Sequence, residues 1–190
     1  VIKEVEPVSI QKVTKYDKSK PYAADGQLYL PRTSGEETYY TNQSFYGDYT
    51  IETEVTVKNT AFGLLFGSGN PNGGLWQFNV AEGNVVKTHQ PGDWSQRDSY
   101  PGDWASNIDV INDCPGVDLN DFVPMKIEVK GNEVKTYLED ELICTNTFAD
   151  GQTSGRLGLR AGVQEEFSVN YIRVSQNGEV IWSDEFDSVD

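Results

Sequence analysis

Two copies of a Pro-Gly-Asp-Trp motif carry the residues whose types and spacing best suit binding chemistry. The copies end at Trp94 and Trp104, and Asp93 and Asp103 stand directly before the two tryptophans. A Pro-Gly turn places each indole on a loop, where exposed aromatic surface is costly unless it meets a partner. The apolar C–H face of a sugar ring stacks on indole, and a carboxylate beside it accepts hydrogen bonds from hydroxyl groups. We interpret both motifs as candidate sugar contacts; anchoring of a long loop by the two tryptophans is the alternative.

Aspartates are concentrated in the stretch 98–121, which has no lysine or arginine. Ca²⁺ takes six to eight oxygen ligands in flexible geometry, and carboxylates on a loop supply them. The spacing is not that of an EF-hand loop. We predict a Ca²⁺ site formed by Asp109, Asp113, Asp118 and Asp121, with a solvated acidic loop as the alternative.

Patterns typical of catalysis are weak. His89 is the one histidine and has no evident partner, and Glu52 and Glu54 share a strand face, as many solvated carboxylates do. The chain has no Gly-x-Ser-x-Gly, no His-Glu-x-x-His and no phosphate-binding glycine loop. We therefore expect that the chain is not an enzyme.

The charge balance excludes some partners. Lysine plus arginine number 15 and aspartate plus glutamate number 30, so the net charge is −15. Nucleic acids and anionic membrane surfaces require a basic face, and no run of 18 apolar residues exists that would span a bilayer. Cys114 and Cys144 either form a disulfide, as is common outside the cell, or remain two thiols.

Alternating apolar and polar residues dominate the chain and predict strands. In residues 49–57, Ile51, Val55 and Val57 fall on one face, whereas residues 61–67 are continuously apolar, as in a fully buried strand. Further strands are predicted at 75–80, 125–130, 133–138, 141–148, 156–161, 167–174 and 179–186. No segment has a convincing helical period. This pattern predicts an all-β protein, an antiparallel two-sheet β-sandwich of the jelly-roll type. We expect one domain over 1–190, with 1–24 an extension or edge strand and 87–123 a long inserted loop region.

Several ordered segments carry a family resemblance. They are Asp25-Gly26-Gln27-Leu28, residues 45–55, 61–67, 75–78, 122–129 with 133–137, 156–160 and 167–174. Together they resemble the concanavalin-A-like, laminin-G-like jelly-roll modules of bacterial glycoside hydrolases. The Glu-x-Asp-x-x-Glu strand of β-glucanases with this fold is absent.

The resemblance implies sugar binding on the concave sheet or at the loops over one edge. Carried onto this sequence, it points to Trp76 and Gln77, and to Arg160 with Glu165 or Glu166. Glu166 is the acid we select as a sugar contact. The alternative for Arg160 with Glu166 is a structural ion pair.

We therefore expect a non-catalytic carbohydrate-binding module, extracellular or on the cell surface. It would hold a covalently attached glycoside hydrolase on a polysaccharide or terminal sugar. Two alternatives stay open: a glycoside hydrolase or polysaccharide lyase of the same fold, and a Ca²⁺-dependent surface adhesion or assembly domain.

Overall fold

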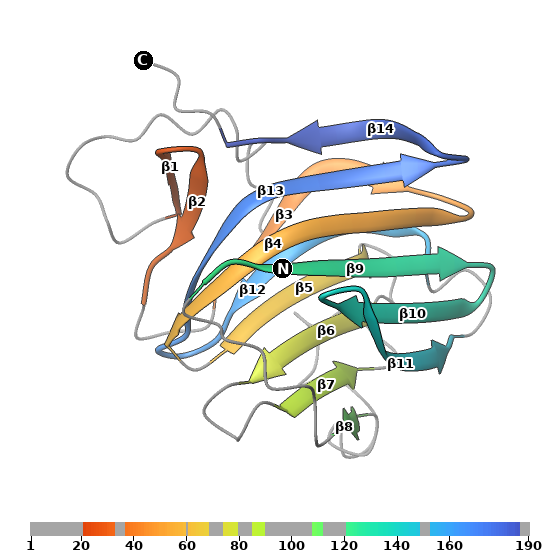
Figure 1. The fold of residues 1–190 in the computed structure, drawn as a ribbon, viewed down its shortest axis with the longest axis horizontal. Coiled ribbons are helices and arrows are strands. Elements are labelled where there is room, and N and C mark those ends of the chain that lie inside the picture. The colour runs from red at the N-terminus through yellow and green to blue at the C-terminus, as the bar shows by residue number, and fades with distance from the viewer. Residues whose placement is uncertain are drawn as a thin grey trace.

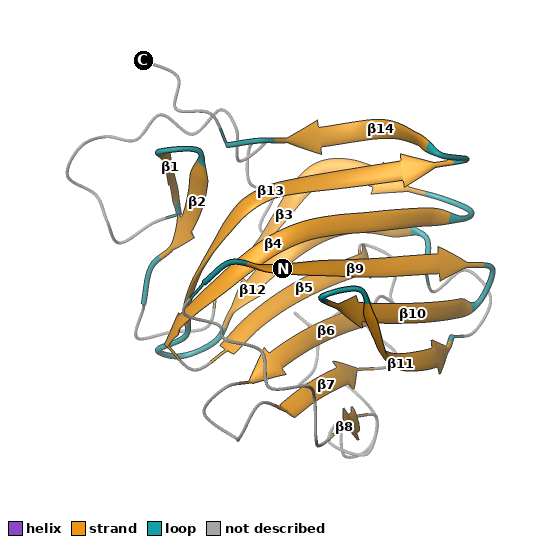
Figure 2. Cartoon of the chain, viewed as in Figure 1, coloured by secondary structure: helices purple, strands orange, loops and turns teal. Residues whose placement is uncertain are grey.

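The structure, a computed structural model, describes residues 21–32, 37–59, 61–68, 74–79, 85–89, 108–111, 121–148 and 153–186 of the 190. Within these ranges all regular structure is strand, arranged as two layers (Figures 1 and 2). The prediction of an all-β, antiparallel two-sheet sandwich is confirmed. A search of the same ranges finds no helix with the length and apolar character needed to cross a membrane.

The larger sheet contains eight strands: β1 (Tyr22–Ala24), β2 (Gln27–Leu30), β4 (Tyr49–Asn59), β9 (Val123–Lys130), β10 (Glu133–Leu138), β11 (Glu141–Thr147), β13 (Glu166–Gln176) and β14 (Glu179–Asp184). Seven follow the order β1-β2-β13-β4-β9-β10-β11, and β14 also pairs with β13. β2 pairs with the first part of β13, Phe167 to Val169, and β14 with the last part, Ile172 to Gln176. The pairing of β13 with β4 shifts its register between Val169 and Ile172.

The smaller sheet contains six strands: β3 (Glu37–Phe45), β5 (Ala61–Ser68), β6 (Gly74–Asn79), β7 (Val85–His89), β8 (Ile108–Ile111) and β12 (Gly155–Ala161). Their order is β3-β12-β5-β6-β7-β8, and every pair is antiparallel. Strand β8 and most of β7 fall inside 87–123, where we expected a loop. The four residues of β8 are too few to show a period of two along the sequence, so pairing with β7 reveals what the pattern did not.

The core lies between the two sheets and is rich in aromatic rings. Phe62 of β5 and Phe167 of β13 meet edge to face, with 4.9 Å between ring centroids and 87° between planes. Tyr49 is buried, and its hydroxyl donates a hydrogen bond to the carbonyl of Thr153. Burial raises the pKa of this phenol, which therefore stays protonated. Aromatic packing thus joins the sheets, and the buried phenol of Tyr49 has its hydrogen bond satisfied.

Two-residue turns fix the register of several hairpins. Asp25 and Gly26 join β1 to β2 with φ of 55° and 71°, the conformation of a type I′ turn. Glu139 and Asp140 join β10 to β11 in the same way, with φ of 49° and 63°. This turn separates two strands that we predicted, 133–138 and 141–148.

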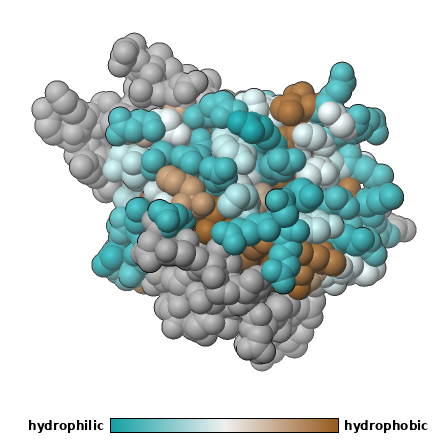
Figure 3. Space-filling view, viewed as in Figure 1, coloured by the Kyte–Doolittle hydropathy of each residue, from teal (hydrophilic) through white to brown (hydrophobic). Residues whose placement is uncertain are grey.

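The outward face of the larger sheet is mostly hydrophilic in its described part (Figure 3). Exposed apolar side chains on the strands of this sheet include Val180 and Ile181 of β14, 58% and 48% exposed, and Leu142 of β11, 47% exposed. Alternation on β4 follows the sequence prediction: Ile51 and Val55 are buried, Glu52 is exposed and Glu54 is half-buried.

Candidate functional site

Arg160 lies in a row of residues that crosses the smaller sheet on the side away from the core. It stands opposite Thr38 of β3 and Gly63 of β5. Gly63 stands opposite Gln77 of β6, and Gln77 opposite Lys87 of β7. Residues opposite each other in antiparallel strands share a face. Because the chain neighbours of Arg160 and of Gly63 include core residues, this row occupies the outer face. A glycine in a strand leaves space for close approach of a ligand or backbone.

Arg160 forms an ion pair with Glu165. The Nη1 atom of Arg160 lies 3.5 Å from Oε2 of Glu165, and both side chains are only 8% exposed. The same Oε2 accepts a hydrogen bond from the backbone N–H of Gly162. Charged groups this deeply buried require pairing, because their separation from water is costly. The pair is thus a preorganised guanidinium and carboxylate at one end of β12.

The tight turn between β12 and β13 positions the carboxylate. The N–H of Glu165 donates to the carbonyl of Gly162 at 3.0 Å, which closes a four-residue turn. Gln164, the third residue of the turn, has a φ of 64°, and its carbonyl accepts a hydrogen bond from the Asn59 side chain. This side-chain contact ties the strained residue to the end of β4.

Replacing Gly162 by alanine is expected to displace the Glu165 carboxylate, because the new Cβ would lie 2.8 Å from Cδ of Glu165. We expect a loss of about 1–3 kcal/mol in the free energy of unfolding, as for other overpacked sites, measured by urea denaturation. In a Glu165→Ala background the same substitution should cost less than about 0.5 kcal/mol. Equal losses in both backgrounds would show that the carboxylate is not the obstacle.

Glu165 and Glu166 lie on different surfaces although they are adjacent. Glu165 pairs with Arg160 at the smaller sheet. Glu166 begins β13 in the larger sheet, opposite Asn59, and its carboxylate lies 3.6 Å from Nε of Arg32. The ion pair that we considered between Arg160 and Glu166 is therefore replaced by one between Arg160 and Glu165. A sugar contact by Glu166 stays a prediction, on another face.

Trp76 and Gln77 occupy alternate rows of β6. Trp76 stands opposite Leu64, which belongs to the core, whereas Gln77 stands opposite Gly63 in the row of Arg160. The register therefore associates Gln77, rather than Trp76, with the ion pair. The sequence alone pointed to both residues, because the pairing of β6 with β5, which places them in different rows, is not encoded locally.

The loop candidates fall mostly outside the described ranges. Asp93, Trp94, Asp103, Trp104, Asp113, Asp118 and Cys114 all do, so their sugar, metal and disulfide predictions stay predictions. Asp109 lies on β8 opposite Thr88, and Asp121 is exposed just before β9. Among the residues that the structure describes, no group of three or more metal-binding side chains gathers. Of the four predicted Ca²⁺ ligands, only Asp121 has a side chain that the structure describes, so the predicted site stays a prediction.

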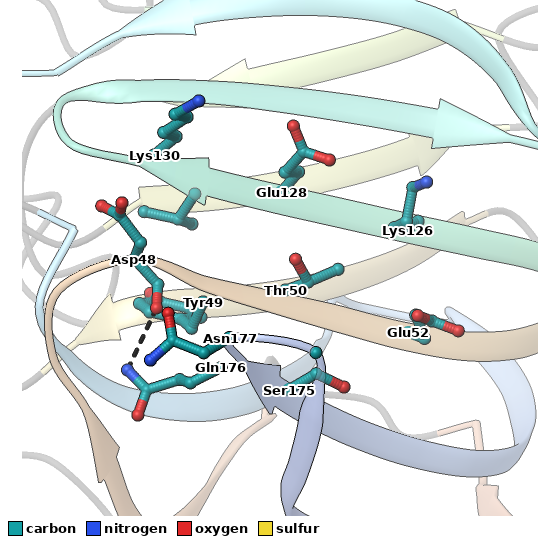
Figure 4. A pocket seen from close by; sticks show the side chains of 12 residues that line it. Asp48, Tyr49, Thr50, Glu52, Lys126, Glu128, Lys130, Ser175, Gln176 and Asn177 are labelled. Carbon is teal, nitrogen blue, oxygen red and sulfur yellow. Dashed lines mark hydrogen bonds between the residues drawn. The ribbon is translucent and has the colours of Figure 1, made fainter.

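The larger sheet carries a polar groove of about 500 Å³ on its outer face (Figure 4). Both signs of charge line the groove. Glu52 of β4 stands opposite Lys126 of β9, and Glu128 of β9 stands opposite Thr50. At one end the side-chain amide of Gln176 donates to the carbonyl of Asp48 at 3.0 Å and to that of Tyr46 at 2.7 Å.

These contacts brace the end of the groove. The carboxylate of Asp48 also accepts from the N–H of Gly131 at 2.8 Å, which joins the β3–β4 and β9–β10 turns. Nζ of Lys126 lies 4.4 Å from the centre of the Tyr137 ring. The groove therefore presents mixed charge on a braced surface, and our sequence analysis named none of its charged residues as a binding group.

Comparisons with known proteins identify the fold. No protein-family model and no curated protein matches the sequence. Among solved structures, the carbohydrate-binding module CBM66 from Bacillus subtilis is 20% identical, with a TM-score of 0.63 over 83% of this chain and 91% of that chain.

Two further structures agree with it. A B. subtilis protein of unknown function with a galectin-like fold is 11% identical, with a TM-score of 0.64 over 83% of this chain and 86% of that chain. The endo-β-1,3-glucanase of Pyrococcus furiosus is 16% identical, with a TM-score of 0.59 over 90% of this chain and 79% of that chain. At these identities the likeness concerns the fold, so this chain has a concanavalin-A-like jelly roll, an architecture shared by carbohydrate-binding modules and glycoside hydrolases.

Proposed function

We propose that this chain is a non-catalytic carbohydrate-binding module that holds an attached glycoside hydrolase on a polysaccharide or a terminal sugar. The observation that carries the proposal is the Arg160–Glu165 pair on the outer face of the smaller sheet, in the row of Gly63 and Gln77. The fold shared with CBM66 supports the same class of function.

The chemistry of the pair suits a polyol. A guanidinium has five N–H donors in a fixed fork, and a carboxylate is an acceptor with about four lone-pair sites. The two groups are held together as an ion pair, with Nη1 of Arg160 at 3.5 Å from Oε2 of Glu165. Charge-assisted hydrogen bonds to hydroxyl groups are stronger than neutral ones. A sugar that meets both groups has a donor and an acceptor for adjacent hydroxyls.

The proposal includes the two loop motifs and the acidic stretch. Trp94 and Trp104 would stack on sugar rings, and the stretch 98–121 would hold a Ca²⁺ ion that orders the loop. Such a protein would act outside the cell or on its surface, where polysaccharides are found.

The chain is expected to bind at least one plant or microbial glycan with a Kd of about 10⁻⁵ to 10⁻³ M, because few sugar residues would be engaged. Titration calorimetry against a panel of oligosaccharides and polysaccharides measures this, in CaCl₂ and again in EDTA. Trp94→Ala and Trp104→Ala run beside the wild type. If both bind as well as wild type, the loop contacts are rejected and the Arg160 row remains.

The same panel separates binding from catalysis. We expect no release of reducing sugar or unsaturated product from any polysaccharide that the chain binds. Absence of heat with every glycan would contradict the binding function, and product release would contradict its non-catalytic part.

A further inference from the structure

A second cavity, of about 260 Å³, opens on the larger sheet beside the β1–β2 hairpin, the short pair of strands labelled in Figure 1. Its lining includes Tyr22, Tyr29, Lys58, Glu166 and Ser168. Neither Arg160 nor Gly63 is among the described residues that line it. The cavity therefore needs an explanation separate from the candidate site on the smaller sheet.

Two tyrosine rings form one wall of this cavity. Tyr22 and Tyr29 are opposite each other in the β1–β2 hairpin, and their rings are stacked, with 5.0 Å between centroids and 14° between planes. Tyr29 is also opposite Ser168 of β13. The three residues lie in one row on the outer face, because Leu28 and Phe167, next to them in the chain, belong to the core. The wall combines apolar ring surface with hydroxyl groups.

Ser168 supplies the most informative observation. The residue is 0% exposed, and its Oγ has no hydrogen-bond partner within the described part of the chain. Buried hydroxyl groups nearly always have a partner, and an unpaired one destabilises the folded protein. Since Ser168 lines the cavity, a ligand there would supply the missing hydrogen bond.

The charges around the cavity favour a neutral ligand. Lys58 and Glu166 both line it and have opposite signs. Glu166 is in turn 3.6 Å from Arg32, and the two side chains are 37% and 49% exposed, so the carboxylate is accessible. The Lys58 ammonium can donate a hydrogen bond to a hydroxyl and the Glu166 carboxylate can accept one, and neither sign of charge dominates enough to select an ion.

The volume limits the ligand to one ring. A cavity of about 150 Å³ in a protein core admits benzene. The space of about 260 Å³ beside Tyr29 is larger, and therefore admits a six-membered ring with its hydroxyl groups but not an extended oligosaccharide.

We propose that this cavity is a second carbohydrate site, which takes a single neutral sugar ring between the Tyr22–Tyr29 wall and the hydroxyl of Ser168. Glu166 and Lys58 hydrogen-bond its outer hydroxyls. Burial, followed by the charge of Asp25, raises the pKa of the Tyr29 phenol, which therefore remains a proton donor at neutral pH. The site shares the ligand class of the proposed function but uses the opposite sheet, so the two can fail separately.

Chemical-shift mapping by NMR on the ¹⁵N-labelled chain tests the proposal, with D-glucose, D-galactose, D-fructose and L-rhamnose as probes. At least one sugar should shift the amides of Tyr29, Glu166 and Ser168 saturably. Ser168→Ala should weaken that response about fivefold, the equivalent of one hydrogen bond of about 1 kcal/mol. Tyr29→Leu should weaken it more, because it removes both the ring and the hydroxyl.

Thr136→Val is the matched control. Thr136 is 1% exposed, and its Oγ1 also lacks a partner in the described ranges, but its residue faces the core, between the buried Val134 and Leu138. Both Thr136→Val and Ser168→Ala should keep or raise Tm, by up to about 2–4 °C. Only Ser168→Ala should weaken sugar binding.

The results that overturn the proposal are specific. They are the absence of saturable shifts at these amides with all four sugars, or an equal response in wild type, Ser168→Ala and Tyr29→Leu. Arg160→Lys leaves the cavity unchanged and should leave its shifts in place. Loss of these shifts in Arg160→Lys would also overturn an independent second site.

Discussion

Arg160→Ala is expected to abolish detectable sugar binding on the smaller sheet and to lower the free energy of unfolding by about 3–5 kcal/mol. The substitution leaves the Glu165 carboxylate, only 8% exposed, without its guanidinium. The effect on binding follows because the fork of donors is lost. Calorimetric titration with the best glycan of the panel measures binding, and urea denaturation measures stability.

Two further variants separate a binding role from a structural one. Arg160→Lys keeps the charge opposite Glu165 but loses the planar fork, so it should bind at least tenfold more weakly, about 1.4 kcal/mol, with a smaller loss of stability. The double variant Arg160→Met with Glu165→Leu removes both charges and should recover much of the stability. It should not recover binding.

The pattern across these variants decides the role of the pair. If the double variant recovers stability and still binds the glycan as wild type does, Arg160 and Glu165 form a structural ion pair only. The sugar contacts would then lie elsewhere, with the loop tryptophans and the Tyr22–Tyr29 cavity as the remaining candidates.

Phe62→Ala is expected to cost about 3–5 kcal/mol, because it opens a cavity in the centre of the sandwich. Phe62 is 0% exposed and meets Phe167, 1% exposed, edge to face across the two sheets. For a chain of this size, the loss corresponds to a fall in Tm of roughly 6–20 °C. Differential scanning calorimetry measures it.

Two control variants accompany Phe62→Ala: one keeps most of the side-chain volume in the core, and the other removes an aromatic ring from the surface. Phe62→Leu retains most of the apolar volume and should cost less than about 1.5 kcal/mol. Tyr46→Ala removes an aromatic ring that is 65% exposed and should change stability by no more than about 0.5 kcal/mol. A loss for Phe62→Ala no greater than that for Tyr46→Ala would contradict the assignment of Phe62 to the core.

Local patterns predicted much of the fold. Alternation predicted β4, β9, β10, β13 and β14 near their observed bounds, and the unbroken apolar run 61–67 predicted a buried strand that is observed as β5. These signals are local because the side chains of a strand alternate between its faces whatever the strand pairs with. The two-residue turn Asp25-Gly26 also implies the pairing of Tyr22 with Tyr29, a signal that our sequence analysis did not use.

Pairing over long sequence separations was not predictable in the same way. Strand β12 joins β3, and β13 joins β2 and β4, across more than one hundred positions in each case. Strand β12 also joins β5, across 88 to 97 positions. No local period encodes which strands become neighbours, since that depends on how both sheets bury their apolar faces together.

By itself the sequence determined that this is an acidic, all-β jelly roll whose polar and aromatic residues suit a sugar better than an anion. Only the tertiary structure decided that Glu165 rather than Glu166 meets Arg160, that Gln77 rather than Trp76 shares its row, and that Ser168 faces two tyrosines. The reason is that a shift of one residue along a strand moves a side chain to the other face, and only the pairing of distant strands sets that register.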